Sequence, residues 1–377
     1  MTQPLAGIRV VDFSTLLPGP FAGLILAEAG AEVIKIERPG RGDEMRGYEP
    51  KFGEDSVNFA LLNRGKRSIA IDLKDPLERA RLMPLIAEAD VLIEQFRPGV
   101  MDRLGLGYEA LRKRNPRLIY CSITGYGQSG PRADVAGHDL NYIAETGLLH
   151  LAAGSAGAPV VPPALIADIG GGTYPAVINI LLALQQRART GQGCRLDIAM
   201  CDHLFPLMYW ALGNGFAAGR WPRPGDELVT GGSPRYRIYR TADDRFLAAA
   251  PLEQRFWDRF CALIGLDDRH RDDAQDRGAT IARVAEIIRG KDAAHWQDVF
   301  RGQDVCCAIV APLEEAVEDP HFRARRLFDW QVTEEGRTIP AVPVPVVPAF
   351  RSNQRRGYPK LGEDDGLLGP ESKVARE

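Results

Sequence analysis

The sequence predicts an α/β fold built on a doubly wound parallel sheet, with a second, smaller domain. Three observations support this prediction. β-rich runs alternate with helical patterns through the first third of the chain, a long apolar helix follows a run of glycines, and a Pro/Gly-rich stretch precedes a later hairpin. Because strands alternating with helices need crossover connections, we expect a parallel sheet with helices on both faces.

The alternating elements are short runs rich in β-branched residues and longer runs with helical spacing of apolar residues. In chain order they are a strand at 8–14, a helix at 20–30, strands at 31–37 and 67–73, a helix at 76–89, and strands at 90–96 and 117–127. Ligands of such sheets bind beyond the carboxyl ends of the strands.

The long apolar helix is expected from residue 167 onward. Pro175 suits a first helical turn and Gly191 a stop, so Asp168 is expected at or just before the helix N-terminus. A linker is expected at 219–235, followed by a hairpin at 235–251 and by helical patterns that form a smaller second domain.

Composition and charge exclude several function classes. The chain has 377 residues, 45% of them apolar, and a formal net charge of −3, so no overall basic field favours nucleic acid or an anionic membrane. The six cysteines show no C-x-x-C spacing, and neither a signal peptide nor an apolar run approaching a membrane span is evident. We expect a cytoplasmic protein that binds neither nucleic acid nor membrane.

Common cofactor motifs are not evident in the sequence. The turn after the first strand, DFSTLLPGPFAG, lacks the G-x-G-x-x-G spacing of a dinucleotide site. The sequence has no G-x-x-x-x-G-K-[ST] loop and no histidine pair at metal-ligand spacing. We therefore expect no nucleotide cofactor and no metal.

Basic side chains follow several predicted strand ends. They are Arg38, Arg64, Lys66, Arg67, Arg97 and Arg103. If these ends share one edge of the sheet, the side chains form a pocket for a phosphorylated ligand, because a guanidinium binds phosphate through two hydrogen bonds. The alternative is that each is a solvated loop charge. Their recurrence at successive strand ends favours the pocket.

His138 and Asp168 each admit two interpretations. His138 is either a proton carrier or a hydrogen-bonded residue at a helix start. Asp168 is either an N-cap or a carboxylate aimed at a ligand. The adjacent Gly170, Gly171 and Gly172 either expose backbone N–H groups that hold an oxyanion or allow close helix-to-strand packing.

Several motifs together resemble one known superfamily over nearly the whole chain. They are the segment PLAGIRVVDFSTLLPGPFAGLILAEAGAEVIKIERPGRGD and the shorter runs NRGKRSIAIDL, VLIEQFRPGV, LIYCSITGYGQSGP, AGHDLNYI, ALIADIGGG and GQG. In these stretches the chain resembles the family III CoA-transferases and α-methylacyl-CoA racemases.

The resemblance implies a fold, a ligand and an assembly. It implies a Rossmann-like large domain at 1–200 plus 330–377, a linker at 201–228 and a small α+β domain at 229–325, in a homodimer whose subunits interlock as rings. The implied ligand is an acyl-CoA thioester, with no cofactor beyond its CoA. By motif match, the residues expected near CoA are Leu16, Leu17, Arg38 and Arg97, with Arg64, Lys66 and Arg103 as further candidates.

The two branches of the superfamily imply different chemistry. In a racemase, His138 and Asp168 would flank the α-carbon and exchange its proton through an enolate, whose oxygen the amides of Gly170–Gly172 would hold. In a CoA-transferase, Asp168 would attack the thioester and form an anhydride. His138 in a G-H-D motif favours the racemase, and the transferase is the alternative.

Glu253 matches the carboxylate that orients the histidine in racemases. The surrounding APLEQRFW departs from the racemase pattern, in which a proline follows the glutamate, because Pro251 comes early here and Gln254 takes the later place. The alternative is an ordinary acid at a helix start. The corresponding helix also carries only Met200 and Met208 where racemases have several methionines, so the sequence does not identify the acyl group.

Overall fold

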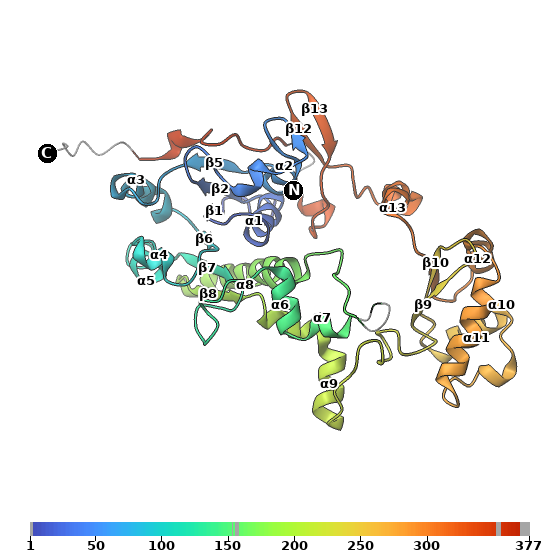
Figure 1. Cartoon of the computed structure of the whole chain (residues 1–377). Helices are drawn as coiled ribbons and strands as arrows, with labels where there is room; N and C mark the ends of the chain where they lie inside the picture. Colours follow the sequence, from blue (N-terminus) through green and yellow to red (C-terminus); the bar gives the residue numbers. More distant parts are fainter. Residues whose placement is uncertain (1–2, 153, 155–157, 352–355, 370–377) are drawn as a thin grey trace. The chain divides into compact units, whose positions relative to one another are not determined.

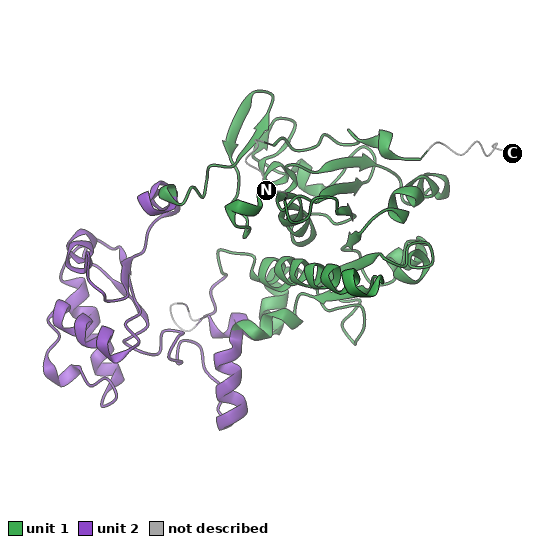
Figure 2. Cartoon of the chain, turned by 180° about the vertical axis from the view of Figure 1, so that it is seen from behind, with its two compact units in different colours: residues 1–146, 162–207, 323–377 green, residues 147–161, 208–322 purple. Residues whose placement is uncertain are grey.

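A computed structural model describes residues 3–152, 154, 158–351 and 356–369, and the chain divides into two units. Unit 1 comprises residues 1–146, 162–207 and 323–377, and unit 2 comprises residues 147–161 and 208–322 (Figure 2). This division corrects the predicted domains at two places. Residues 147–161 group with unit 2, and the predicted linker 201–228 contains helix α9 (Tyr209–Ala218), which ends at Gly219 in the left-handed conformation.

A six-stranded sheet in the order β5-β2-β1-β6-β7-β8 forms the centre of unit 1, and every neighbouring pair is parallel (Figure 1). The strands are β1 (Arg9–Asp12), β2 (Glu32–Glu37), β5 (Arg67–Ala70), β6 (Val91–Glu94), β7 (Ile119–Thr124) and β8 (Arg195–Ala199). The central strands are buried along almost their whole length, as expected when helices cover both faces. The doubly wound parallel sheet is confirmed.

Helices cover the two faces of this sheet. Unit 1 contains the helices α1 (Pro18–Glu28), α2 (Val57–Asn63), α3 (Pro76–Ala87), α4 (Val100–Arg103), α5 (Tyr108–Leu111), α6 (Asp139–Glu145) and α8 (Tyr174–Thr190). α1 and α8 contact each other and the strands, whereas α3, α4 and α5 share a separate hydrophobic core with the strands.

The strand order reverses between β1 and β6. From β1 the chain builds outward through β2 to β5, and it then returns to the other side of β1 as β6. Such a reversal leaves a crevice beyond the carboxyl ends of the two central strands, and this is where open α/β sheets bind ligands. The fold therefore directs attention to the turns after Asp12 and Glu94.

The C-terminal segment returns to unit 1. It contributes the hairpin β12 (Gln331–Glu334) and β13 (Arg337–Pro340), and another small hairpin in unit 1 pairs β3 (Lys51–Phe52) with β4 (Asp55–Ser56). Glu28 of α1 accepts from Arg351 Nε at 2.9 Å and from Arg64 Nε at 2.8 Å. These three side chains are buried, so the ion pairs fix the returning segment against α1.

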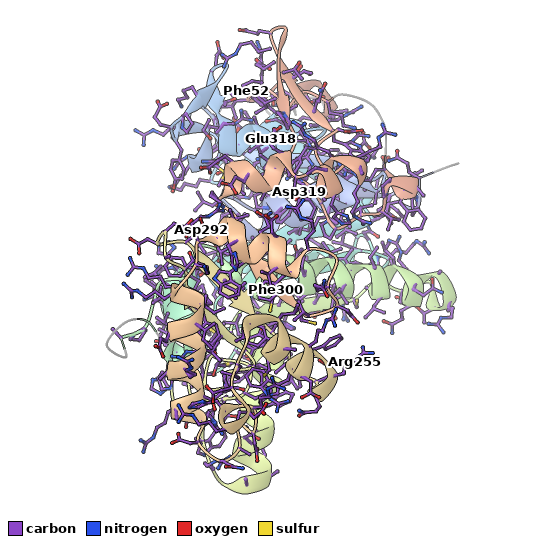
Figure 3. The ribbon with its side chains drawn as sticks, turned by 90° about the vertical axis from the view of Figure 1, so that its right-hand side faces the viewer. Phe52, Arg255, Asp292, Phe300, Glu318 and Asp319 are labelled. Carbon is purple, nitrogen blue, oxygen red and sulfur yellow. The ribbon has the colours of Figure 1, made fainter. Side chains whose placement is uncertain are left out.

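Unit 2 has its own sheet and core. The antiparallel strands β9 (Arg237–Arg240) and β10 (Phe246–Ala249) form the predicted hairpin, and β11 (Cys307–Ile309) pairs with β10. Phe300 (Figure 3) belongs to the aromatic core beside Trp257, Phe260 and Trp296. The helices are α7 (Leu148–Leu151), α10 (Gln254–Ile264), α11 (Arg277–Arg289), α12 (Ala293–Phe300) and α13 (Leu313–Glu318), and α14 (Pro320–Ala324) leads back to unit 1.

The helical run Ala167–Thr190 is long and apolar enough to cross a membrane by length and composition alone. This corrects the expectation that no apolar run approaches that length. Half of its most apolar 18-residue window is buried, and its α8 part contacts α1, β7 and β8. Because the core helix of a globular domain meets the same criteria, the run is weak evidence for a membrane span.

Candidate active site

A cavity of about 380 Å³ lies where the strand order of unit 1 reverses. The turns that follow β1, β6 and β7 line it, together with the segment that leads into α6. Its lining includes Leu16, Gln95, Phe96, Arg97, Pro98, Thr124, Tyr126, Val135, His138, Asn141, Tyr142 and Met200. Three predicted site residues, Leu16, Arg97 and His138, therefore line one cavity.

His138 is the N-cap residue of α6. Its backbone N–H donates to Asn141 Oδ1 at 3.0 Å, and its carbonyl accepts from the Asn141 N–H at 2.8 Å. The backbone of His138 thus makes capping bonds with Asn141, and the residue is part of the cavity lining. The position of His138 at the start of α6 is therefore compatible with a role of its side chain in proton transfer.

Asp139 connects the His138 segment to the segment of Asp168. Its buried carboxylate accepts from the Ala167 N–H at 2.6 Å and from the Asp168 N–H at 3.0 Å. The N-terminus of a helix leaves such N–H groups without helical partners and favours a negative charge. Asp139 therefore caps a helix that begins 28 residues after it in the sequence.

Asp168 lies in the π-helical turn Ala167–Thr173 that leads into α8. Burial, followed by the negative charge of Asp139, raises the pKa of Asp168 to about 6, whereas His138 acts to lower it. Asp168 is thus in electrostatic reach of both Asp139 and His138. A carboxyl group that titrates near neutral pH can both accept and return a proton.

Gly170, Gly171 and Gly172 lie inside the helical run, where N–H groups bond along the helix, so they are not the bare amides of a helix tip. A Cβ on Gly171 would lie 2.4 Å from the Met200 carbonyl oxygen, and one on Gly172 would lie 3.1 Å from Pro18 Cβ. This corrects the expected oxyanion site. Close packing, the alternative interpretation, explains both of these glycines.

Tyr142 is a cavity residue that the sequence analysis does not identify. A Cβ on Gly125 would lie 2.4 Å from its ring and one on Gly137 2.7 Å, so these two glycines make room for it. The Tyr142 hydroxyl donates to the Gly137 carbonyl at 2.6 Å, and burial and Asp168 raise its pKa to about 12. Tyr142 is therefore an uncharged wall of the cavity.

The predicted basic residues separate into two groups. Arg38, Arg97 and Arg103 are exposed, and Arg97 lines the cavity. Arg64 is buried against Glu28, and the Lys66 ammonium lies 3.2 Å from the Asp12 carboxylate, where both side chains are inaccessible to solvent. The prediction that Arg64 and Lys66 bind phosphate is therefore wrong, because both cations form internal ion pairs.

The other two predicted residues are a helix cap and an acid of unit 2. Leu17 is the N-cap residue of α1, directly beside Leu16. Glu253 is the exposed N-cap residue of α10, and within the described residues its carboxylate makes no capping hydrogen bond. Its pairing with the histidine of unit 1 stays a prediction.

Comparison with known proteins finds similarity along the whole chain. A family model described as CoA-transferase family III matches residues 5–365. Alpha-methylacyl-CoA racemase of Homo sapiens is 36% identical, over 99% of this chain and 94% of its own length. Acetyl-CoA:oxalate CoA-transferase of Acetobacter aceti is 34% identical, over 97% of this chain and 95% of its own.

A solved structure shares the fold as well. A CaiB/BaiF family protein from Brucella suis superposes with a TM-score of 0.82 at 30% identity, and the match covers 97% of this chain and 98% of that one. Both racemases and transferases are thus relatives at similar identity, so similarity alone does not select one reaction.

Gly171→Ala and Gly170→Ala test the packing role of the glycines. The added methyl at 171 meets a backbone oxygen at 2.4 Å, so we expect unfolding free energy to fall by about 1–3 kcal/mol. At 170 the nearest neighbour, Leu207 Cδ1, is 3.7 Å away, so that variant should be at least as stable as the native protein. Urea titration measures both, and equal stabilities would contradict this assignment.

Proposed function

The chain belongs to CoA-transferase family III, and from this premise we propose that it is an acyl-CoA racemase acting on a 2-methylacyl-CoA. The observation that carries the proposal is the grouping of His138 and Asp168 around Asp139, with the pKa of Asp168 raised to about 6. Exchange of a proton at one carbon needs two groups that can each accept and return a proton, and an imidazole and a carboxyl group with a raised pKa are suited to this exchange.

The proposed reaction begins with removal of the α-proton next to the thioester carbonyl. One of the two groups takes the proton, the substrate becomes an enolate, and the other group returns a proton to the opposite face. Asp139 holds the two segments together, which limits how far the two groups can move apart. Holding the reacting groups in a fixed geometry lowers the entropic part of the barrier to proton transfer.

A family III CoA-transferase is the second candidate. The 34% identity to acetyl-CoA:oxalate CoA-transferase over nearly the whole chain favours it. In that reaction the Asp168 carboxylate attacks the acyl carbon and releases the CoA thiolate, which then attacks the aspartyl carbonyl of the anhydride and releases the first acid. The acceptor acid takes CoA from the resulting aspartyl thioester by the same two steps in reverse. Such a mechanism uses Asp168 as nucleophile and needs no second proton carrier, which leaves His138 without a role.

We also propose that the protein is a cytoplasmic homodimer. A groove of about 590 Å³ in unit 1 is lined almost entirely by apolar side chains, including Leu5, Ile25, Tyr174, Ile178 and Val347. Exposed apolar surface of this kind marks contact sites, and a second copy of the chain is the occupant that the family resemblance implies.

Sedimentation equilibrium should give twice the chain mass, and a monomer at micromolar concentration would contradict the dimer.

Deuterium exchange tests the choice of reaction. In D2O the protein should introduce deuterium at the α-carbon of 2-methylacyl-CoA, and His138→Ala should slow this exchange by about a hundredfold or more. Exchange that is unaffected in the variant would exclude the two-group mechanism. Formation of a hydroxamate at Asp168 with hydroxylamine, without exchange, would instead support the transferase.

The pH profile tests the charge environment of Asp168. When Asp168 acts as base, kcat/KM should fall as the pH drops through about 6, because the carboxyl becomes protonated. Asp139→Asn leaves the burial of Asp168 in place but removes the negative charge that adds to it in raising this pKa, and it keeps an acceptor for the cap, so the midpoint should move to lower pH. Asp134→Asn removes one negative charge from an exposed position in the loop that precedes His138, so the midpoint should stay unchanged in this control variant. An upward or absent shift in Asp139→Asn would contradict the assignment.

A further inference from the structure

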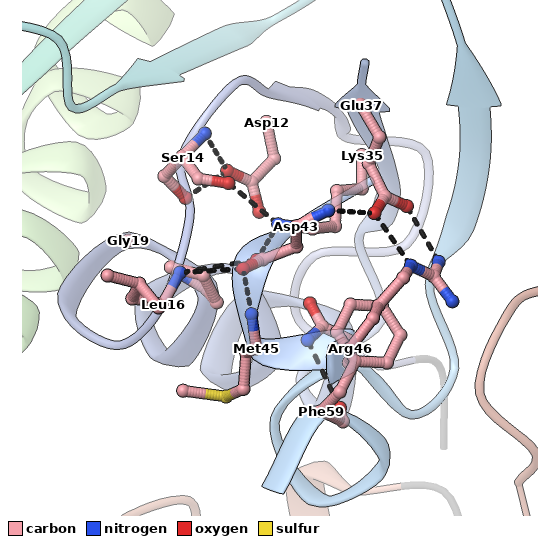
Figure 4. A network of polar contacts seen from close by, with 12 residues as sticks. Asp12, Ser14, Leu16, Gly19, Lys35, Glu37, Asp43, Met45, Arg46 and Phe59 are labelled. Carbon is pink, nitrogen blue, oxygen red and sulfur yellow. Dashed lines mark hydrogen bonds and ion pairs between the residues drawn. The ribbon is translucent and has the colours of Figure 1, made fainter. Parts of the chain in front are cut away.

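A buried cluster of charged side chains lies beneath the turn between β1 and α1 (Figure 4). Its fully buried members are three acids and three bases, and the partly buried Asp55 also pairs with Arg46 at 2.6 Å. The acids are Asp12, Glu37 and Asp43, and the bases are Lys35, Arg46 and Lys66, each less than one-tenth exposed. Burial of charges is costly even when they are paired, so the arrangement needs an explanation beyond stability.

Asp43 connects this cluster to the turn. The Leu16 N–H donates to Asp43 Oδ1 at 3.1 Å and to Oδ2 at 3.2 Å, and the Met45 N–H donates to Oδ1 at 3.0 Å. The Lys35 ammonium lies 2.8 Å from Oδ2 and also donates to the Ser14 carbonyl at 2.6 Å. The pair therefore holds the turn at both Ser14 and Leu16.

Leu16 has an unusual backbone conformation. Its φ is 62°, in the left-handed region that favours glycine, and its side chain lines the cavity. A strained residue of this kind persists only where surrounding bonds fix it, and such residues are common at binding sites. The bonds of Asp43 to the Leu16 N–H are the ones that fix it here.

We propose that Asp43 is a positioning residue that sets the affinity for the CoA part of the substrate. It would do so by holding Leu16 in the cavity wall through the hydrogen bonds of its carboxylate to the Leu16 N–H. The proposal rests on the acyl-CoA function proposed above. We assign the effect on affinity to the oxygen that accepts the Leu16 N–H, and not to the charge of the ion pair between Asp43 and Lys35.

Two double variants separate the effect of the hydrogen-bond acceptor at residue 43 from the effect of the charge of Asp43. Both carry Lys35→Met, which removes the ammonium that pairs with Asp43, so neither leaves a buried cation unpaired. Asp43→Asn keeps an oxygen for the Leu16 and Met45 amides, whereas Asp43→Val removes it while suiting the extended backbone there (φ −65°, ψ 136°). Circular dichroism melts establish that each variant is folded, and Asp43→Ala replaces Asp43→Val if the latter does not fold.

We expect KM for the acyl-CoA to be about tenfold higher in the Val variant than in the Asn variant, with kcat within about twofold, as for loss of one binding interaction. Hydrogen exchange of the peptide containing Leu16 should be faster in the Val variant only. Equal KM values in two folded variants would overturn the role in affinity, and equal exchange would overturn the anchoring of Leu16. If the native protein turns over no acyl-CoA, the proposed function fails, and the exchange comparison still decides whether Asp43 fixes the turn.

Discussion

The carboxylate of Asp139 holds together the two segments on which the candidate chemistry depends. It follows His138 directly in the chain and accepts hydrogen bonds from the N–H groups of Ala167 and Asp168. The same negative charge satisfies the helix N-terminus and adds to burial, the larger cause, in raising the pKa of the Asp168 carboxyl group. One contact therefore contributes to both the geometry and the electrostatics of the site, and a neutral side chain there could supply only the first.

The sheet supplies the place for this contact. Its strand order reverses between β1 and β6, and the turns that follow these strands provide Leu16 and Arg97 to the cavity that His138 also lines. Side chains from two other turns hold the turn after β1: Gln95 Oε1 accepts from the Gly19 N–H at 3.2 Å, and Asp43 accepts from the Leu16 N–H. The cavity wall is thus part of the sheet's own hydrogen-bond network.

The sequence predicts the sheet well because β-branched runs and helical spacing are local signals. It does not identify β8, a run of only five residues, Arg195–Ala199, although polar and apolar residues alternate along it. It also cannot distinguish the solvated cation Arg97 from the buried cations Arg64 and Lys66, because burial depends on partners such as Glu28 and Asp12 far away in the chain. For the same reason Asp139 is missed: an aspartate at a helix start normally caps its own helix, and this one caps another.

The proposed reaction requires that His138 and Asp168 act on one carbon atom. A crystal structure of the protein with a bound 2-methylacyl-CoA would measure this geometry. We expect an imidazole nitrogen and a carboxylate oxygen to lie about 3–3.5 Å from the α-carbon, on opposite faces of it. A thioester bound with its α-carbon beyond reach of either group, or with both groups on the same face, would contradict the proposed reaction.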